Sequence, residues 1–188
     1  MSHVRRHTMT SAEFVVWEER QDRKWEFDGF QPVAMNGGTI AHSAIQRNIL
    51  VALATRLKGN RCAPYGPDVR VPIPSGSYRY PDALVTCEKL APKSRDVIAP
   101  IDIFEVLSDS TARVDRTEKL PEYLSIPSVQ RYVMLEQDAP FITVVTRSDT
   151  GWALSILRAD DTLALPEIGL EIPLAEFYID VEFEPPPE

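Results

Sequence analysis

Two stretches decide the fold of this chain: RYPDALVTCE (Arg79–Glu88) and IDIFEVLSDST (Ile101–Thr111). Each contains a short apolar run of the kind that forms a buried strand, and each carries a carboxylate inside that run, Asp82 or Glu105. A charged acid in a buried strand costs several kcal/mol unless a salt bridge, a proton or a cation offsets the cost. If the two strands are neighbours, both acids lie within reach of one metal ion, and Mg²⁺ suits such a pair of carboxylates.

Each acid alone also has an ordinary structural explanation. Asp82 follows Pro81 and can simply begin a strand, whereas Glu105, between Phe104 and Val106, can pair with an arginine. For either residue by itself, these explanations carry as much weight as a metal site. The metal site becomes the better interpretation only when both acids are taken together with the features that follow.

The rest of the chain alternates between helical and strand-like patterns. Thr10 or Ser11 followed by Glu13 is typical of a helix N-terminus, the pair Asp28–Gly29 favours a hairpin turn, and Gly59 ends a long apolar stripe of helical spacing. In chain order we expect a short helix at 10–22, a hairpin at 24–35, a long helix at 39–59, strand-like runs at 63–73, 79–87 and 99–108, a helix at 115–127, strands at 129–140, 141–151 and 151–160, and a final strand and turn at 163–178.

This order predicts an α/β or α+β fold with a mixed central β-sheet flanked by helices. Pro121 lies inside the helix expected at 115–127 and removes a helix hydrogen bond, so that helix should start near Leu120 or be kinked. At 188 residues, the chain is expected to form one domain over 9–183, with flexible tails at 1–8 and 184–188.

Composition narrows the function further. The net charge of −8 argues against a protein that coats nucleic acid without sequence preference, but it is compatible with an enzyme that grips phosphate through a carboxylate-held metal ion. No apolar run is long enough for a membrane span, and the N-terminus lacks the apolar stretch of a signal peptide, so we expect a cytoplasmic protein without membrane contact. Cys62 and Cys87 are expected to form neither a disulfide framework nor a CxxC metal pair.

Six segments occur along the chain in a fixed order: WEFDG (25–29), AHSAIQRNI (41–49), PDALV (81–85), EVLSDST (105–111), DRTEKLPEYLSIPSVQRYVML (115–135) and LPEIGLEIPLAEFYIDVEF (165–183). Taken together, these segments resemble the Uma-two family of restriction endonuclease-like proteins, a branch of the PD-(D/E)XK nuclease superfamily. The resemblance covers roughly residues 9–183, and the ordered set of motifs is specific, whereas "PD" alone would not be.

The resemblance implies a restriction endonuclease-like fold and a metal site built on Asp82 and Glu105. The superfamily pattern places a lysine two residues after the second acid, but this chain has Leu107 there, on the same face of the strand as Glu105. Lys119 matches a lysine that appears in this family on the following helix, and the resemblance implies that it replaces the usual one. Without the resemblance, Lys119 would be read as a solvated surface residue.

Five further residues complete the expected site. The resemblance implies Glu26 as an additional catalytic acid, although a surface strand residue is about as good an explanation. The Val106 carbonyl is a plausible further metal ligand. His42 and Tyr123 are expected to contact substrate or support the site, with packing as the alternative for both, and Arg113 is expected to frame the entrance.

These features predict a Mg²⁺-dependent endonuclease, with Mn²⁺ as a substitute, that hydrolyses phosphodiester bonds in DNA. The alternative is a catalytically inactive nuclease-fold protein that binds nucleic acid or protein. A metal-independent hydrolase is a weaker third reading, because the chain has no GxSxG elbow. DNA contacts are expected from four scattered basic residues, Arg47, Arg70, Arg79 and Arg113. A homodimer is expected through exposed strand edges in FITVVT (141–146) or RYVML (131–135).

Overall fold

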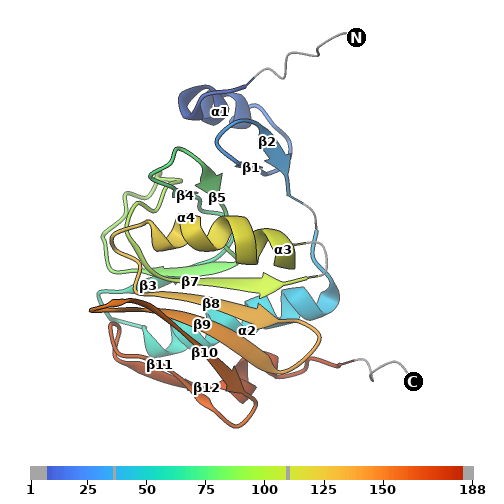
Figure 1. Cartoon of the computed structure of the whole chain (residues 1–188), viewed down its shortest axis with the longest axis vertical. Helices are drawn as coiled ribbons and strands as arrows, with labels where there is room; N and C mark the ends of the chain where they lie inside the picture. Colours follow the sequence, from blue (N-terminus) through green and yellow to red (C-terminus); the bar gives the residue numbers. More distant parts are fainter. Residues whose placement is uncertain (1–7, 36, 109–110, 184–188) are drawn as a thin grey trace.

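The computed structural model describes residues 8–35, 37–108 and 111–183. The tails expected at 1–8 and 184–188 therefore lie outside the described residues, apart from residue 8. The architecture is a mixed α+β fold around a six-stranded sheet, as the element order predicted (Figure 1). Within the described ranges, no helix combines the length and the apolar character needed to cross a membrane.

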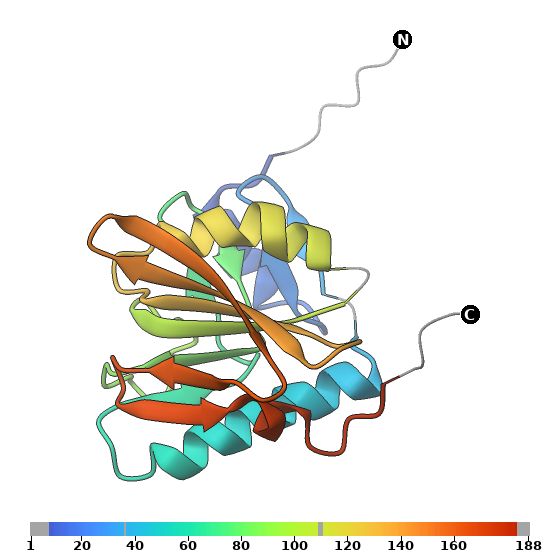
Figure 2. The same ribbon diagram turned by 60° about the horizontal axis from the view of Figure 1, so that its bottom comes forward.

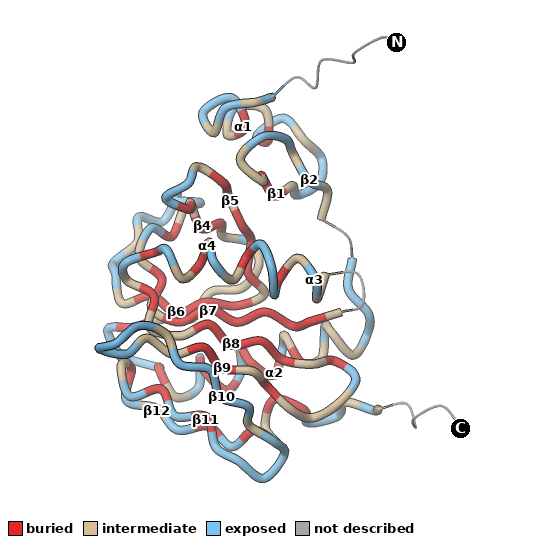
Figure 3. Tube along the Cα trace, viewed as in Figure 1, coloured by how far each residue is buried: buried red, intermediate tan, exposed pale blue. Residues whose placement is uncertain are grey.

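The six-stranded sheet is antiparallel except for one pair of neighbours, β7 and β8, which run parallel. The long strand β7 lies inside the sheet and is buried along nearly its whole length, which explains its apolar sequence (Figure 3). From one edge to the other, the strands are β10 (Gly151–Arg158), β9 (Phe141–Ser148), β8 (Arg131–Glu136), β7 (Pro100–Leu107), β6 (Ala83–Thr86) and β3 (Ala63–Tyr65).

Helices cover both faces of this sheet (Figure 2). Alternation along β7 sends Phe104 and Val106 into one core and Ile103 and Leu107 into the other. The first core lies under α2, β11, β12 and η2, and the second lies under α3, η1 and α4. The bounds of these elements are α2 (Ile40–Arg56), α3 (Ala112–Val114), η1 (Asp115–Lys119), α4 (Leu120–Leu124), β11 (Thr162–Leu165), β12 (Leu170–Pro173) and η2 (Leu174–Tyr178).

A smaller sheet in the order β2-β1-β5-β4 carries the N-terminal part of the chain. Helix α1 (Ser11–Glu18) begins with the expected capping box between Thr10 and Glu13, and its Phe14 stacks on Phe27 of the hairpin with ring centroids 4.9 Å apart. The expected hairpin at 24–35 is confirmed as β1 paired with β2. The strands of this sheet are β1 (Trp25–Phe27), β2 (Pro32–Ala34), β4 (Val71–Pro72) and β5 (Tyr78–Arg79).

The α-helix that contains Pro121, α4, starts at Leu120 as expected, but it continues a helical segment that begins earlier in the chain. Helical structure begins at Ala112, widens into a π-turn at Asp115–Lys119 and continues as α4 through Pro121. The N–H of Leu120 donates to the carbonyl of Asp115, five residues back, which is the wider π spacing. This wider turn accommodates a proline that cannot donate a hydrogen bond of its own.

The two cysteines form a disulfide bond, and the expectation that they would not pair is wrong. Ala63 of β3 pairs with Thr86 of β6, which places Cys62 and Cys87 opposite each other at the end of this ladder. Sequence spacing carried no sign of this contact, because the two residues are 25 positions apart and only the strand register brings them together.

The strand edges also differ from expectation. Both FITVVT and RYVML lie in β9 and β8, and each of these strands has a hydrogen-bonded neighbour on both sides. The free edges of the six-stranded sheet are β10 and β3. The C-terminal part likewise forms a complete hairpin, β11 with β12, where only one strand and a turn were expected.

Candidate active site

Strand pairing brings Asp82 and Glu105 together. Ala83 on β6 pairs with Phe104 on β7 in an antiparallel ladder, so the residues that adjoin this pair, Asp82 and Glu105, lie side by side on the face covered by α4. The N–H of Asp82 donates to Oε2 of Glu105 across 3.4 Å, and the N–H of Val106 donates to Oδ2 of Asp82 across 2.7 Å. Among the described residues, no arginine forms an ion pair with either acid, so the ordinary explanation for Glu105 finds no support there.

The π-turn delivers Lys119 to the two acids. The side chain is 9% exposed, and its Nζ lies 3.0 Å from Oε1 of Glu105. The same Nζ lies 3.1 Å from Oε1 of Glu26 and 3.1 Å from Oδ1 of Asp115. Lys119 is therefore a buried ammonium bridging three carboxylates rather than a solvated surface residue.

Glu26 reaches the same cluster from the small N-terminal sheet. Its Oε1 accepts a hydrogen bond from the N–H of Tyr80, and its Oε2 accepts one from Arg79 at 3.2 Å. Arg79 is in turn held by both oxygens of Glu122, at 2.6 and 3.1 Å. This chain of contacts fixes the β1 hairpin against the main sheet. It also leaves Arg79 buried in ion pairs, so the expectation that Arg79 contacts DNA is not supported.

Asp82 has partners on α2 as well. His42 lies near the start of that helix, just after the N-cap Thr39, and its Nε2 is 3.3 Å from Oδ2 of Asp82. Gln46, one turn later, donates to Oδ1 of Asp82 at 2.9 Å. Burial of the imidazole opposes its protonation, but the hydrogen bond and negative charge of Asp82 outweigh burial and raise the pKa of His42 above its ordinary value.

The electrostatics of the cluster follow from burial and from its excess of acids. Burial disfavours the charged form of Lys119, but Glu105, Glu26 and Asp115 outweigh it and hold the pKa of the ammonium well above its ordinary value. Burial raises the pKa of Glu105 well above its ordinary value; Lys119 opposes that rise, whereas Asp115, Asp82 and Glu26 add to it. Three carboxylates therefore contact Lys119, and a fourth, Asp82, lies beside Glu105 with His42 as its basic neighbour.

These residues line a pocket of about 200 Å³ between the N-terminal hairpin, the start of α2 and the α3–η1 turn. Its acidic wall consists of Glu26, Asp82, Glu105 and Asp115, and its cationic side chains are His42 and Lys119. Gly38 packs closely on the imidazole, since a Cβ at this position would lie 2.8 Å from Nδ1 of His42. The pocket is large enough for a phosphate group with its surrounding waters.

The remaining residues expected in the site occupy different positions. Val106 lines the pocket beside the acids. Tyr123 is fully buried behind Glu105 and donates its hydroxyl to Oε1 at 3.0 Å, so it supports the acid and does not face the pocket. Arg113 points to solvent with 77% of its side chain exposed and lies 3.7 Å from Glu118. Arg70 is buried between Glu18 and Asp96, which removes it from the expected DNA contacts.

Sequence reasoning missed two residues of the cluster. Asp115 was not among the residues expected in the site, although its position four residues before Lys119 places both on one helix face. Gln46 lies four residues after His42 on α2, and the same spacing could have identified it. The Arg79–Glu122 pair could not have been found in this way, since 43 residues separate its members.

The donor set fits a hard divalent cation bound partly through water. Among the residues the structure describes, no group of three or more His, Cys, Asp and Glu side chains forms a ready-made metal centre. Asp82 and Glu105 would supply oxygen ligands to such an ion, and the carboxylates around Lys119 would add negative charge beside it. Mg²⁺ binds through one or two carboxylates and keeps several waters, which matches this set better than a fully protein-coordinated ion would.

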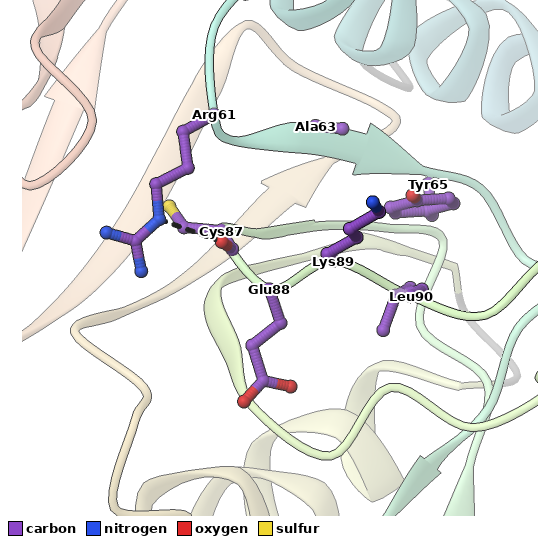
Figure 4. A pocket seen from close by; sticks show the side chains of 7 residues that line it. All are labelled: Arg61, Ala63, Tyr65, Cys87, Glu88, Lys89 and Leu90. Atoms are coloured by element: carbon purple, nitrogen blue, oxygen red, sulfur yellow. Dashed lines mark hydrogen bonds between the residues drawn. The ribbon is translucent and has the colours of Figure 1, made fainter.

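A second, wider hollow of about 770 Å³ lies at the other end of β6. Figure 4 shows the side chains of Arg61 and Glu88 extending away from the ribbon there, with Lys89 beside Tyr65. Nε of Arg61 donates to the carbonyl of Cys87 at 3.1 Å, next to the disulfide. The hollow contains no cluster of acids, so its size alone gives it no chemistry comparable to that of the smaller pocket.

Comparisons with known proteins identify the family of this chain. A family model described as "Putative restriction endonuclease" (Uma2) matches residues 11–175. "Uncharacterized protein slr1290" and "Uncharacterized protein sll1609" of Synechocystis sp. (strain ATCC 27184 / PCC 6803 / Kazusa) are each 32% identical to the chain; the first match covers 93% of this chain and 94% of that protein, the second 69% and 75%.

A crystal structure of "a putative nuclease belonging to DUF820" from Anabaena variabilis ATCC 29413 superposes with a TM-score of 0.73 at 16% identity, over 91% of this chain and 98% of that one. At this identity the likeness concerns the fold, and it confirms the restriction endonuclease-like fold that the sequence motifs implied.

Proposed function

The chain belongs to the Uma2 family of restriction endonuclease-like proteins, which supports a nuclease-like function, and from this premise we propose that it is a divalent-metal-dependent endonuclease acting on DNA. The observation that carries the proposal is the convergence of Asp82, Glu105 and Lys119 in one pocket. Three elements that are separate in sequence meet there, and each contributes a group that phosphodiester hydrolysis requires.

In this proposal Asp82, Glu105 and the carbonyl of Val106 hold Mg²⁺, or Mn²⁺ in its place. A divalent cation in such a site supplies charge neutralisation for the phosphate and lowers the pKa of bound water. Glu105 is oriented by Lys119 and by the hydroxyl of Tyr123, which fix one of its oxygens. Asp82 is oriented by the N–H of Val106 and by Gln46.

Lys119 acts as a fixed positive charge. Because the surrounding carboxylates raise its pKa well above the ordinary value, it stays protonated and cannot remove a proton from water. Its role is to hold Glu105 in place and to stabilise, through its charge, negative charge that develops on the phosphate. Glu26 holds this ammonium from the hairpin side and so contributes to catalysis through Lys119.

His42 and Arg113 differ in how they would contact a nucleic acid. The imidazole of His42 lies in the pocket next to Asp82 and is the basic group placed to contact a phosphate oxygen. Arg113 is exposed on the helix that forms one side of the entrance, where it attracts nucleic acid only weakly and in a salt-dependent way.

The alternative is a nuclease-fold protein that binds nucleic acid or protein without cutting it. Leu107 at the usual lysine position and the net charge of −8 favoured this alternative. The contact between Lys119 and Glu105 at 3.0 Å argues against it, because the missing lysine has a replacement at the acid it would serve. The ion pairs that occupy Arg70 and Arg79 argue for it, because they leave fewer cations for DNA.

Titration calorimetry with MnCl₂, followed by nicking of supercoiled plasmid and cleavage of a single-stranded RNA, separates these readings. We expect the wild-type protein to bind Mn²⁺ and to nick the plasmid, and the Asp82→Asn variant to do neither. Asp102→Asn is the matched control, since Asp102 is a buried acid on β7 that lies outside the pocket. An Asp82→Asn protein that nicks like wild type would overturn the site, and metal binding without any cleavage would favour the inactive alternative.

A further inference from the structure

The two edges of the six-stranded sheet differ in how they are protected. Strand β3 is three residues long, contains Pro64, and is fastened at its start by the Cys62–Cys87 bond. Strand β10 is eight residues long, and its sequence GWALSILR has no proline and no charge before Arg158. Folded proteins protect their edges with short strands, prolines, charges and bulges. β3 has such protection, whereas β10 has none of it along seven residues.

The register shows which backbone groups of β10 face the free edge. Hydrogen-bonded and non-hydrogen-bonded pairs alternate along an antiparallel ladder. The N–H of Arg147 donates to the carbonyl of Gln130, which directs the odd-numbered residues of β9 toward the β8 side. The even-numbered residues of β9 therefore bond to β10, and since Ser148 pairs with Gly151, their partners are the odd-numbered residues of β10.

Trp152, Leu154 and Ile156 thus direct their N–H and C=O groups away from the sheet. Arg158 would continue this row, but its N–H donates to Oδ2 of Asp161 at 2.7 Å and its carbonyl accepts from the N–H of Asp161 at 2.8 Å. These two contacts also confirm that even-numbered residues of β10 face outward. The open edge is therefore a row of three residues with a defined end.

The side chains of this row are also uncovered. Leu154 is 65% exposed and Ile156 is 52% exposed, and they lie on the same face of the sheet as Val145, which pairs with Leu154. Figure 3 shows β10 exposed along most of its length, in contrast to the buried β7. Two large apolar side chains therefore stand next to six backbone groups with no described strand beyond them.

We propose that a second copy of this chain occupies this edge, with β10 pairing antiparallel to β10 about a two-fold axis beside Leu154. In this register Leu154 faces its own counterpart and Trp152 faces Ile156 of the partner subunit. All three outward residues then form hydrogen-bonded pairs, and the row ends where Asp161 already occupies Arg158.

A second copy suits this edge better than an unrelated extended peptide. A two-fold axis perpendicular to the sheet keeps equivalent faces on the same side, so the exposed leucine and isoleucine side chains of the two copies come together. The row between Gly151 and Leu157 carries no charge, so its self-association brings no like charges together. The contact is small compared with the roughly 1,200–2,000 Å² of stable interfaces, so we expect a dissociation constant in the micromolar range.

This proposal does not rest on the nuclease function. Strands β8 and β9 separate β10 from β7, and none of the pocket residues lies on β10. An inactive protein can therefore form the dimer, and a monomeric protein can still be active.

Sedimentation velocity over a concentration series tests the dimer. We expect a monomer–dimer equilibrium for the wild type. For Leu154→Lys we expect the dissociation constant of the dimer to be higher by about tenfold or more. Val51→Lys is the matched control, because Val51 is a similarly exposed aliphatic residue, on α2, and this variant should associate like wild type. A wild-type protein that stays monomeric at all concentrations, or a dimer that is unaffected by Leu154→Lys, would overturn the proposal.

Amide exchange measured by NMR tests the wild-type protein without any substitution. The amides of Trp152, Leu154 and Ile156 should exchange fast in dilute samples and slow down as the concentration rises, while their odd-numbered neighbours stay protected throughout. Even-numbered amides that show no dependence on concentration would contradict the pairing.

Oxidative cross-linking tests the register. Leu154→Cys should form a covalent dimer that reduction separates, whereas Ser155→Cys should not, because in this register the two Ser155 positions lie diagonally, about 7–8 Å apart. A wild-type sample run in parallel accounts for the native Cys62–Cys87 bond. Cross-linking through Ser155 and not through Leu154 would overturn the proposed axis.

Discussion

Strand β7 carries two buried carboxylates, Asp102 and Glu105, which point to opposite faces of the sheet and meet opposite surroundings. Glu105 faces a pocket, where Lys119, Tyr123 and the N–H of Asp82 donate to its oxygens. Asp102 faces the other core, and neither of its oxygens has a donor among the groups the structure describes. One strand thus carries an acid that borders a pocket, Glu105 (the open acid), and an acid that is enclosed in the core, Asp102 (the closed acid).

The surroundings of the closed acid favour its protonated form. Burial raises the pKa of Asp102 well above its ordinary value, and the neighbouring Glu167 raises it further, with Arg131 opposing the rise. Arg131 also forms an ion pair with Glu167. A protonated Asp102 next to one carboxylate and one arginine leaves little net charge. The comparison teaches that burial and a raised pKa do not identify a site; the number of surrounding acids and access to solvent do.

The largest expected effect concerns cleavage. If Glu105 is the open acid, Glu105→Gln should lower plasmid nicking by about a hundredfold to a thousandfold, because it removes charge that the reaction requires. The isosteric change Asp102→Asn on the same strand should leave the rate within a few-fold of wild type. Nicking rates at saturating Mn²⁺ measure both, and equal losses for the two variants would remove the distinction between the acids.

The next effect concerns the stability of the two clusters. Lys119→Met leaves three buried carboxylates without their common cation, which should cost about 3–5 kcal/mol of unfolding free energy. Mn²⁺ should restore part of this loss by occupying the pocket. Urea denaturation with and without Mn²⁺ measures the recovery.

Arg131→Met is the control for this experiment, since it removes the cation from the closed acid pair. We expect this variant to be destabilised as well, because Glu167 loses its ion pair. Mn²⁺ should not restore any of the unfolding free energy that Arg131→Met loses. Recovery of the Arg131→Met variant by Mn²⁺ would show that the ion acts elsewhere than in the pocket.

A smaller effect should appear in the pH dependence of stability. Because the folded-state pKa of Asp102 is raised above its ordinary value of 3.8, the folded protein holds a proton that the unfolded chain releases. The resulting contribution to stability is present below that value and is lost as pH rises through the folded-state pKa. Asp102→Asn lacks this titration, so its stability relative to wild type should increase with pH above 3.8. Urea titrations at several pH values measure this, and parallel curves for the two proteins would contradict it.

The smallest effect concerns the hydroxyl behind Glu105. Tyr123→Phe removes one donor to Oε1 and should cost about 1 kcal/mol of unfolding free energy. Tyr132→Phe is the matched control: it removes a hydroxyl that donates to the Asp115 carbonyl at 3.3 Å and should cost less. Thermal unfolding measures both. A larger loss for Tyr132→Phe would mean that the hydroxyl of Tyr123 contributes little to holding Glu105.

The sequence was sufficient to predict the layered sheet, the two central strands and the long helix, because these depend on local periodicity and end signals such as Thr10 and Gly59. It also drew attention to Asp82 and Glu105. The apolar pattern alone does not separate Glu105 from Asp102, since both are acids in the same run. The family resemblance singled out Glu105, and the physical difference between the two acids comes from neighbours supplied by β8, the α3–η1 turn and the β11–β12 turn.

Contacts between distant segments account for the other differences. The disulfide depends on the register of β3 against β6, and the burial of Arg79 depends on Glu122, 43 residues away. The free edges of the sheet lie at β10 and β3 and not at β8 or β9, where we expected them. Strand order depends on the whole sheet, whereas the expectation was based on local composition.

The π-turn at Asp115–Lys119 places one residue more in its turn than an α-helix would. Deleting one residue between Asp115 and Lys119 would return the turn to α-helical spacing and shorten their separation from four residues to three, which changes how the carboxylate and the ammonium lie relative to each other along the helix face. In evolutionary terms, a single inserted codon separates an ordinary helix from one that can build this cluster. The length of this segment should therefore vary less among functional descendants than the identity of its exposed residues.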